Sequence, residues 1–176
     1  MSDALALDTA RLRLRELEPR DAAFLVELLN EPAFLRYIGD RGVRDEAGAL
    51  GYVERARASY ATHGHGLLLV ERRADGEPLG ICGLIRRDGL DAPDLGFALR
   101  AAHEGRGYAL EAARAVLEHA ARVLRIARVL AIFAHDNERS RRLLDRLEFQ
   151  PAEGVRLPGD NVELCAFARE LRAASL

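Results

Sequence analysis

Two glycines separated by one residue mark the place in this chain where the residue types favour ligand binding. Gly105 and Gly107 lie between an alternating apolar stretch, residues 94–99, and a stretch with apolar residues at helical spacing, residues 108–123. Glycine allows a tight turn and leaves no Cβ to obstruct a ligand. A helix that begins at such a turn directs its unpaired N–H groups and the positive end of its dipole toward it. The turn is therefore a candidate site for a phosphate or pyrophosphate.

Three interpretations of this turn remain open from the residues alone. The glycines can serve packing in an ordinary strand-to-helix connection. They can belong to a dinucleotide-binding turn, but Leu110 stands where the third glycine of that motif is required, and the turn lies past the middle of the chain. The third interpretation is the pyrophosphate loop of an acyl-CoA-dependent acyltransferase.

The third interpretation has specific support from a family resemblance. The run from Gly105 to Ala112 resembles the G-x-G-Y-A-x-E-A signature of the GNAT superfamily of N-acetyltransferases, and most of all its RimJ/RimL-like group, named for ribosomal-protein N-terminal acetyltransferases. A second run, from Asn137 to Phe149, resembles the family's N-x-x-S…L-x-x-x-G-F pattern. The resemblance covers about residues 10–169. Two positions depart from it, because Ala102 replaces the usual Gln or Arg and Glu148 replaces the Gly before Phe149.

The resemblance implies a site for acetyl-CoA. No metal is expected, because neither cysteine has metal-ligand spacing with a histidine or with the other cysteine. The resemblance also implies that backbone N–H groups of the loop hold the pyrophosphate, with Arg106 as an exposed charge beside it, and that the strand at 94–99 splays from the strand at 125–133 so that pantetheine pairs with its backbone. A continuous sheet is the alternative. Asn137 is expected at the pantetheine end, although a helix N-cap alone would also explain it. The implied cofactor-binding residues are Phe97, Ala98, Leu99, Glu104, Gly105, Arg106, Gly107, Tyr108, Ala109, Asn137 and Ser140.

Asp94 is the candidate general base, because it matches an acidic position of the family. An amine with a pKa near 10 is mostly protonated at pH 7, and a carboxylate at the mouth of the groove can accept that proton. The alternative is a solvated turn acid that follows Pro93.

Ser140 is the candidate that protonates the departing thiolate. Many family members place a tyrosine at the position of Leu144, which has no proton to give, and Ser140 lies one helical turn earlier and is expected to face the same groove. Bulk water and Tyr108 are the other candidate donors, and a bond from the serine to a carbonyl of the preceding turn is its structural alternative.

The composition narrows the class of protein. A chain of 176 residues with a net charge of −2 is expected to form one domain over residues 1–176, without the basic surplus of a nucleic-acid binder. It has neither an apolar run of membrane-spanning length nor a signal pattern, so we expect a cytoplasmic protein. Cys82 and Cys165 are expected to be buried free thiols, and the five histidines are expected to have surface or packing roles.

The periodicity predicts a mixed, mostly antiparallel α/β (α+β) sheet of six to seven strands with helices on both faces, which is the GNAT arrangement. The expected strands are residues 11–17, 66–73, 78–85, 94–99, 125–133, 150–157 and 162–170, and the expected helices are residues 19–30, 45–61, 108–123 and 138–147.

The predicted function is transfer of an acetyl group from acetyl-CoA to a primary amine by direct attack in a ternary complex. The acceptor is either a protein N-terminus or a small amine such as an antibiotic, a polyamine or an amino acid. A non-catalytic acyl-CoA-binding module is the alternative from another class. The partners expected are acetyl-CoA and the amine, with neither nucleic acid nor membrane, in a monomer or a homodimer. The loop at 35–40, the helix at 45–61 and the turn at 158–161 are expected to shape the acceptor pocket.

Overall fold

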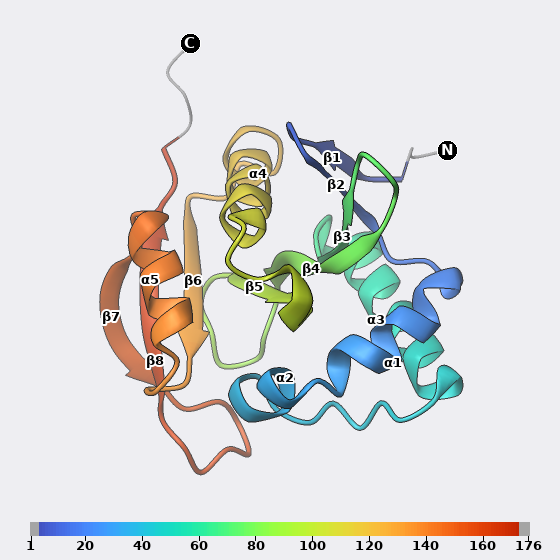
Figure 1. Ribbon diagram of the computed structural model, residues 1–176. Coiled ribbons are helices and arrows are strands. Elements are labelled where there is room, and N and C mark those ends of the chain that lie inside the picture. Colours follow the sequence, from blue (N-terminus) through green and yellow to red (C-terminus); the bar gives the residue numbers. More distant parts are fainter. Residues whose placement is uncertain (1–3, 173–176) are drawn as a thin grey trace.

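A computed structural model describes residues 4–172 and places its strands in one mixed sheet (Figure 1). The sheet has eight strands in the order β1-β2-β3-β4-β5-β6-β8-β7. Neighbouring strands are antiparallel except β5 and β6, which are parallel. The strands are β1 (Ala6–Asp8), β2 (Leu12–Glu16), β3 (Leu67–Arg72), β4 (Pro78–Ile85), β5 (Asp94–Leu99), β6 (Arg128–Phe133), β7 (Gln150–Val155) and β8 (Leu164–Glu170).

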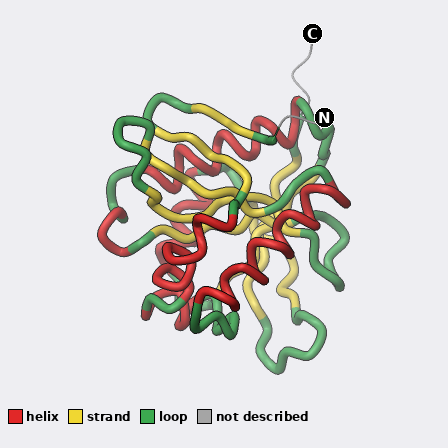
Figure 2. Tube along the Cα trace, turned by 90° about the vertical axis from the view of Figure 1, so that its right-hand side faces the viewer, coloured by secondary structure: helices red, strands yellow, loops and turns green. Residues whose placement is uncertain are grey.

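Helices cover both faces of this sheet (Figure 2). The α-helices are α1 (Ala22–Leu29), α2 (Pro32–Tyr37), α3 (Glu46–His63), α4 (Tyr108–Arg122) and α5 (Glu138–Arg146), and the short 3-10 helices are η1 (Pro19–Asp21) and η2 (Ala101–His103). One apolar cluster joins α4 and α5 to the sheet, and a second joins α1, α2 and α3 to its other face. The predicted α/β arrangement is thus confirmed, with eight strands instead of six or seven. Within residues 4–172, no helix combines the length and apolarity needed to cross a bilayer.

The apolar spacing of α4 shows why the sequence predicted this helix well. Leu110, Ala113, Leu117 and Ala120 are all buried against the sheet, as their spacing on one helical face requires. The burial of this face fixes the position of the helix, so the amino end of α4 is held rigidly where the glycine turn meets it.

Three parts of the fold differ from the prediction. β1 was not predicted, because three residues carry too little alternation to identify a strand. The segment at 35–40 was expected to be a loop, but its first three residues belong to helix α2, which begins at Pro32, where the missing N–H of proline costs nothing. β6 begins at Arg128 instead of 125, because Arg125 adopts a left-handed φ of 56° and interrupts the extended backbone.

The parallel pair β5 and β6 separates along its length, as predicted. Asp94 and Leu130 are the residues at which the two strands are in register, next to a bond from Leu130 N to Pro93 O at 2.9 Å. The carboxyl half of β5 continues beside β4 while it leaves β6. The alternative of a continuous sheet is therefore excluded, and the backbone of Phe97–Leu99 borders an opening.

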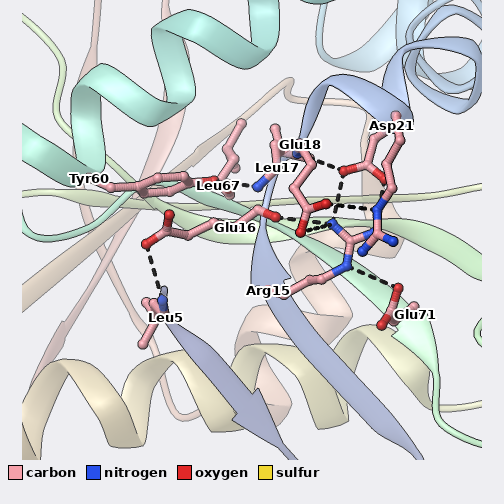
Figure 3. A network of polar contacts seen from close by, with 10 residues as sticks. Leu5, Arg15, Glu16, Leu17, Glu18, Asp21, Tyr60, Leu67 and Glu71 are labelled. Atoms are coloured by element: carbon pink, nitrogen blue, oxygen red, sulfur yellow. Dashed lines mark hydrogen bonds and ion pairs between the residues drawn. The ribbon is translucent and has the colours of Figure 1, made fainter. Parts of the chain in front are cut away.

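A network of hydrogen bonds and ion pairs joins the amino-terminal strands to the helical layer (Figure 3). Arg15 on β2 donates from both terminal nitrogens to the Asp21 carboxylate at 2.9 Å and from Nε to Glu71 on β3 at 3.2 Å. Asp21 also accepts from Glu18 N at 2.8 Å. Nearby, Tyr60 of α3 accepts from Leu17 N at 3.3 Å. The network holds β2, η1 and β3 in one relative position.

Candidate active site

Two adjoining cavities open where β5 and β6 separate. The larger, of about 610 Å³, lies between the glycine turn and α5, and the smaller, of about 230 Å³, lies between α2, β5 and the segment that precedes β8. The volume of the larger cavity is in the range of small-molecule sites. The residues that line both cavities are Phe34, Tyr37, Ile38, Phe97, Ala98, Asn137 and Ser140. Two ligands, one bound in each cavity, would therefore contact each other at these residues.

The glycine turn has the backbone conformation that its sequence predicts. Gly105 and Gly107 have φ values of 75° and 80°, in the left-handed region that favours glycine. The first bond of α4 runs from Glu111 N to Gly107 O at 3.1 Å, so the N–H groups of residues 108–110 have no acceptor within the helix. These N–H groups, together with the helix dipole, make the turn suitable for an anionic group.

Side chains behind the turn hold it in place. Arg11 donates from Nη1 to the Arg106 carbonyl at 3.0 Å and from Nε to Glu111 at 2.7 Å, and its guanidinium lies 4.5 Å from the centre of the Tyr108 ring. Glu111 also accepts from the Thr9 hydroxyl at 2.6 Å. The glutamate of the signature therefore anchors the loop to the start of β2, a role that the sequence did not reveal.

The predicted loop residues do not all face the larger cavity. Glu104, Gly105, Gly107, Tyr108 and Ala109 line it, as do Phe97, Ala98 and Leu99 of β5. Arg106 is exposed, as predicted, and it is not among the lining residues.

Three arginines on α5 line the larger cavity and were not predicted. They are Arg139, Arg142 and Arg146, and Arg139 forms an ion pair with Glu104 across the mouth of the cavity. Their spacing of three and four residues places them on one helical face. That spacing is the signal in the sequence that was available to find them. Their charge favours a polyanionic ligand such as the phosphates of CoA.

Asn137 and Ser140 lie at the junction of the two cavities. Asn137 Oδ1 accepts from Ser140 N at 3.2 Å, so the asparagine is a helix N-cap and a lining residue at once. Within residues 4–172, the Ser140 hydroxyl forms no hydrogen bond. The structural alternative, in which this hydroxyl binds a carbonyl of the preceding turn, is therefore not observed. The prediction that Leu144 faces the groove is wrong, because Leu144 is 1% exposed and packs in the core. The helix is rotated by one position, so that Leu143 lines the cavity instead.

Asp94 lines the smaller cavity at the point where β5 leaves β6. It is 1% exposed, and its Oδ1 accepts from Arg87 Nε at 2.9 Å. Burial raises the pKa of this carboxyl above its usual range, and the charges of Arg87 and Arg41 oppose the rise. The alternative of a solvated turn acid is excluded by this burial.

Three polar residues of the smaller cavity were not singled out from the sequence. Tyr37 of α2 lines both cavities, and Tyr52 of α3 and Arg41 line the smaller one. Burial raises the pKa of Tyr52, and nearby arginines oppose that rise. Tyr37 belongs to the segment 35–40, which was expected to shape the acceptor pocket and which borders both cavities through Tyr37 and Ile38.

The thiols and histidines are arranged mostly as expected. Cys82 is buried, which raises the pKa of its thiol to about 12 and makes it a poor nucleophile. Cys165 is only half-buried, against expectation, and its Sγ lies 3.1 Å from His135 Nδ1. His65 and His103 are buried beside Leu84 O and Glu77 respectively, outside both cavities.

Comparisons with known proteins agree with this geometry. The sequence model of the family described as acetyltransferase (GNAT) domain matches residues 11–150. The chain is 29% identical over 159 residues to the uncharacterized protein YkkB of Bacillus subtilis (strain 168), across 89% of this chain and 91% of that protein. An acetyltransferase structure from Agrobacterium tumefaciens str. C58 has a TM-score of 0.80 and 26% identity, across 94% of each chain.

A further solved structure is similar in fold. It is RimL, a ribosomal L7/L12 alpha-N-protein acetyltransferase in complex with coenzyme A, with a TM-score of 0.83 at 20% identity, across 96% of this chain and 99% of that one.

Proposed function

The chain belongs to the GNAT family of acyl-CoA-dependent N-acetyltransferases, and we propose that it transfers an acetyl group from acetyl-CoA to a primary amine by direct attack in a ternary complex. The observation that carries the proposal is the junction of two cavities at Phe97, Asn137 and Ser140. The larger cavity takes acetyl-CoA and the smaller one takes the acceptor. The thioester and the amine then meet at the junction, and much of the catalysis is the positioning of the two reactants.

Acetyl-CoA is a fit for the larger cavity on three counts. The free N–H groups at the start of α4 suit its pyrophosphate, and the arginines of α5 suit its negative charge. The backbone of β5, from Phe97 to Leu99, borders the opening left by β6 and can pair with the amides of pantetheine. Asn137, whose Oδ1 is used by the N-cap, retains its amide N–H groups for the same amides.

In the proposed step, the amine nitrogen bonds to the thioester carbonyl carbon and the carbon–sulfur bond breaks, so CoA leaves as a thiolate. Asp94 accepts one proton from the amine, directly or through a water. A raised carboxyl pKa makes Asp94 a better base near neutral pH than an exposed aspartate. Ser140 donates a proton to the thiolate and recovers it from water.

The acceptor is a protein N-terminus or a small-molecule amine. The smaller cavity, of about 230 Å³, takes a small molecule whole or the end of a longer chain. A non-catalytic acyl-CoA-binding module is the competing function, and it would need the larger cavity alone.

Release of CoA thiol over a panel of acceptors tests the proposal. The panel contains peptides with free N-termini, polyamines, aminoglycosides and amino acids, each at saturating acetyl-CoA, and calorimetric titration with CoA serves as the control for a loaded site. Acceptor-dependent thiol release with an acetylated product detected by mass supports transfer. Tight CoA binding with no release above hydrolysis for every acceptor contradicts transfer and favours the binding module.

A further inference from the structure

The smaller cavity has an unusual balance of charge for a site that receives an amine. Its charged lining residues are Arg41, Arg87, Asp94 and Asp160. A simple alkylammonium ion would be attracted to the two carboxylates but repelled by the two guanidinium groups. A molecule that carries both an ammonium and an anionic group can match both signs at once.

Arg87 keeps most of its hydrogen-bonding capacity free. Within residues 4–172, its side chain donates a hydrogen bond only from Nε, to Asp94 at 2.9 Å. A guanidinium has five N–H donors, so the two terminal nitrogens remain. They are not sealed in the protein either, because among the described residues only His103 Nδ1 is a buried side-chain atom without a partner. The terminal nitrogens of Arg87 are therefore accessible from outside, and Arg87 is one of the residues that line the smaller cavity.

Arg41 supplies a second guanidinium to the same cavity. Arg36 and Arg44, which flank it, form ion pairs with Asp136 and Asp40, whereas Arg41 has no ion pair in the described part of the chain. Its charge acts on the cavity, since it lowers the pKa values of Asp94 and Tyr52 against the effect of burial.

We propose that the acceptor is an amino acid or a similar small amine whose carboxylate is held by Arg41 and the terminal nitrogens of Arg87, with its amine directed to Asp94. This inference rests on the proposed function. A planar guanidinium matches the two oxygens of a carboxylate, and charge-assisted bonds of this kind are stronger than neutral ones. The smaller cavity, of about 230 Å³, has room for a molecule of the size of an amino acid.

Matched pairs of acceptors test the inference. Glycine, leucine and phenylalanine are compared with methylamine, 3-methylbutylamine and 2-phenylethylamine, which lack only the carboxylate, and kcat/KM is expressed per concentration of free amine. We expect at least one amino acid to be preferred about tenfold or more, because one charge-assisted contact of about 1.4 kcal/mol or more gives that ratio. No preference in any pair overturns the inference, as does a preference for an aminophosphonate over the matching amino acid.

Variants assign the preference to the residues. Arg41→Gln should reduce the carboxylate preference about tenfold, and Arg41→Lys should restore part of it, because charge returns without the planar fork. Arg41 is exposed, so its replacement is compatible with folding, whereas Arg87 pairs with a buried carboxylate. Arg86→Gln is the matched control, since Arg86 is exposed and lines neither cavity. Retention of the preference in Arg41→Gln contradicts the assignment.

A binding measurement separates this inference from the proposed function. The same amino acids and amines are titrated calorimetrically into the CoA-loaded protein, where no transfer can occur. Amino acids that bind with an Arg41-dependent Kd support the carboxylate site even if no acceptor is acetylated. Amines that are acetylated while amino acids neither bind nor react overturn the carboxylate site and leave the proposed function standing.

Discussion

The molecule contains two buried arginine–aspartate pairs that are used in opposite ways. In the amino-terminal network, Arg15 binds Asp21 through both terminal nitrogens and Glu71 through Nε (Figure 3). In the smaller cavity, Arg87 binds Asp94 through Nε, and its terminal nitrogens face open space. The aspartates are similarly buried, at 6% and 1% exposed. The two aspartates are therefore alike in burial and in ion pairing. The pairs differ in how many N–H groups of the arginine remain without an acceptor.

From that difference we expect the pair of Arg15 and Asp21 to support the fold and the pair of Arg87 and Asp94 to take part in the proposed chemistry. A network in which nearly every donor has an acceptor has little to offer a ligand, and the energy of its bonds opposes the cost of burying its charges. A pair with unused donors beside a cavity can bind a ligand without first breaking a bond. The same contrast extends to the N–H groups of residues 108–110, which have no acceptor within α4.

Removal of Asp21 should cause the largest loss, and it should be a loss of stability. Asp21→Ala leaves Arg15 without its bidentate partner, and breaking a buried pair in this way lowers the free energy of unfolding by about 3–5 kcal/mol. Urea denaturation measures it. Asp8→Ala, which breaks the exposed pair of Asp8 with Arg13, is the matched control and should leave the midpoint unchanged. Equal effects of the two variants would show that the network does not stabilise the fold.

Replacement of Asp94 should affect catalysis, in a pH-dependent way. Asp94→Asn should lower kcat/KM for the amine about 10²–10⁴-fold near neutral pH, with CoA affinity preserved. The active form of a base is deprotonated, so wild-type activity falls as the pH drops through the raised pKa of Asp94, above the range of an exposed aspartate. The variant should approach wild type at high pH, where free amine is abundant. Parallel pH–rate profiles would remove Asp94 from the mechanism.

A side chain at Gly107 should weaken CoA binding. Gly107→Val places a β-branched residue at a φ of 80°, and strain of about 1–3 kcal/mol distorts the turn that presents the N–H groups. We expect CoA affinity to fall about tenfold or more in calorimetric titration. Arg106→Ala should cost less, because its exposed charge is screened. Unaltered affinity in the glycine variant would exclude this turn as the phosphate site.

Loss of the Ser140 hydroxyl should have the smallest effect of these substitutions, and the affected quantity should be kcat. Ser140→Ala at saturating acetyl-CoA should lower kcat about tenfold, with the Kd for CoA unchanged. The effect is modest because the CoA thiolate resembles that of cysteine, with a pKa near 8.5, and leaves without a strong acid. A kcat within about twofold of wild type would leave water, or Tyr37 at the same junction, as the proton source.

The sequence predicted the sheet because its signals are local. Leu12 and Leu14 alternate with arginines and are fully buried on β2, and the spacing of Leu110 and Leu117 fixed the face of α4. β1 and α2 are too short for the alternation of a strand or the apolar spacing of a helix to be recognised in the sequence. Their positions depend on neighbours, since β1 pairs with β2 and Phe34 of α2 joins the core beneath α1 and α3.

The sequence predicted those parts of the candidate site in which a single physical requirement selects one residue type. Gly105 and Gly107 were found because only glycine adopts their left-handed φ without strain. The place of Arg41 in the lining of the smaller cavity was not found, because it depends on a loop that folds beside Asp94 from more than fifty positions earlier. The rotation of α5 was also invisible, since Leu143 and Leu144 are both apolar and only packing decides which faces the core.

A side-by-side measurement of Asp94→Asn and Asp21→Asn tests the central contrast most directly. Each variant is assayed for its free energy of unfolding and for kcat/KM of the folded fraction at neutral pH. The account predicts opposite results: Asp94→Asn loses activity with little change in stability, because burial already disfavours the charge that the substitution removes. Asp21→Asn loses stability with little change in kcat/KM. A loss of stability in Asp94→Asn as large as in Asp21→Asn, with the activity of the folded fraction retained, would contradict it.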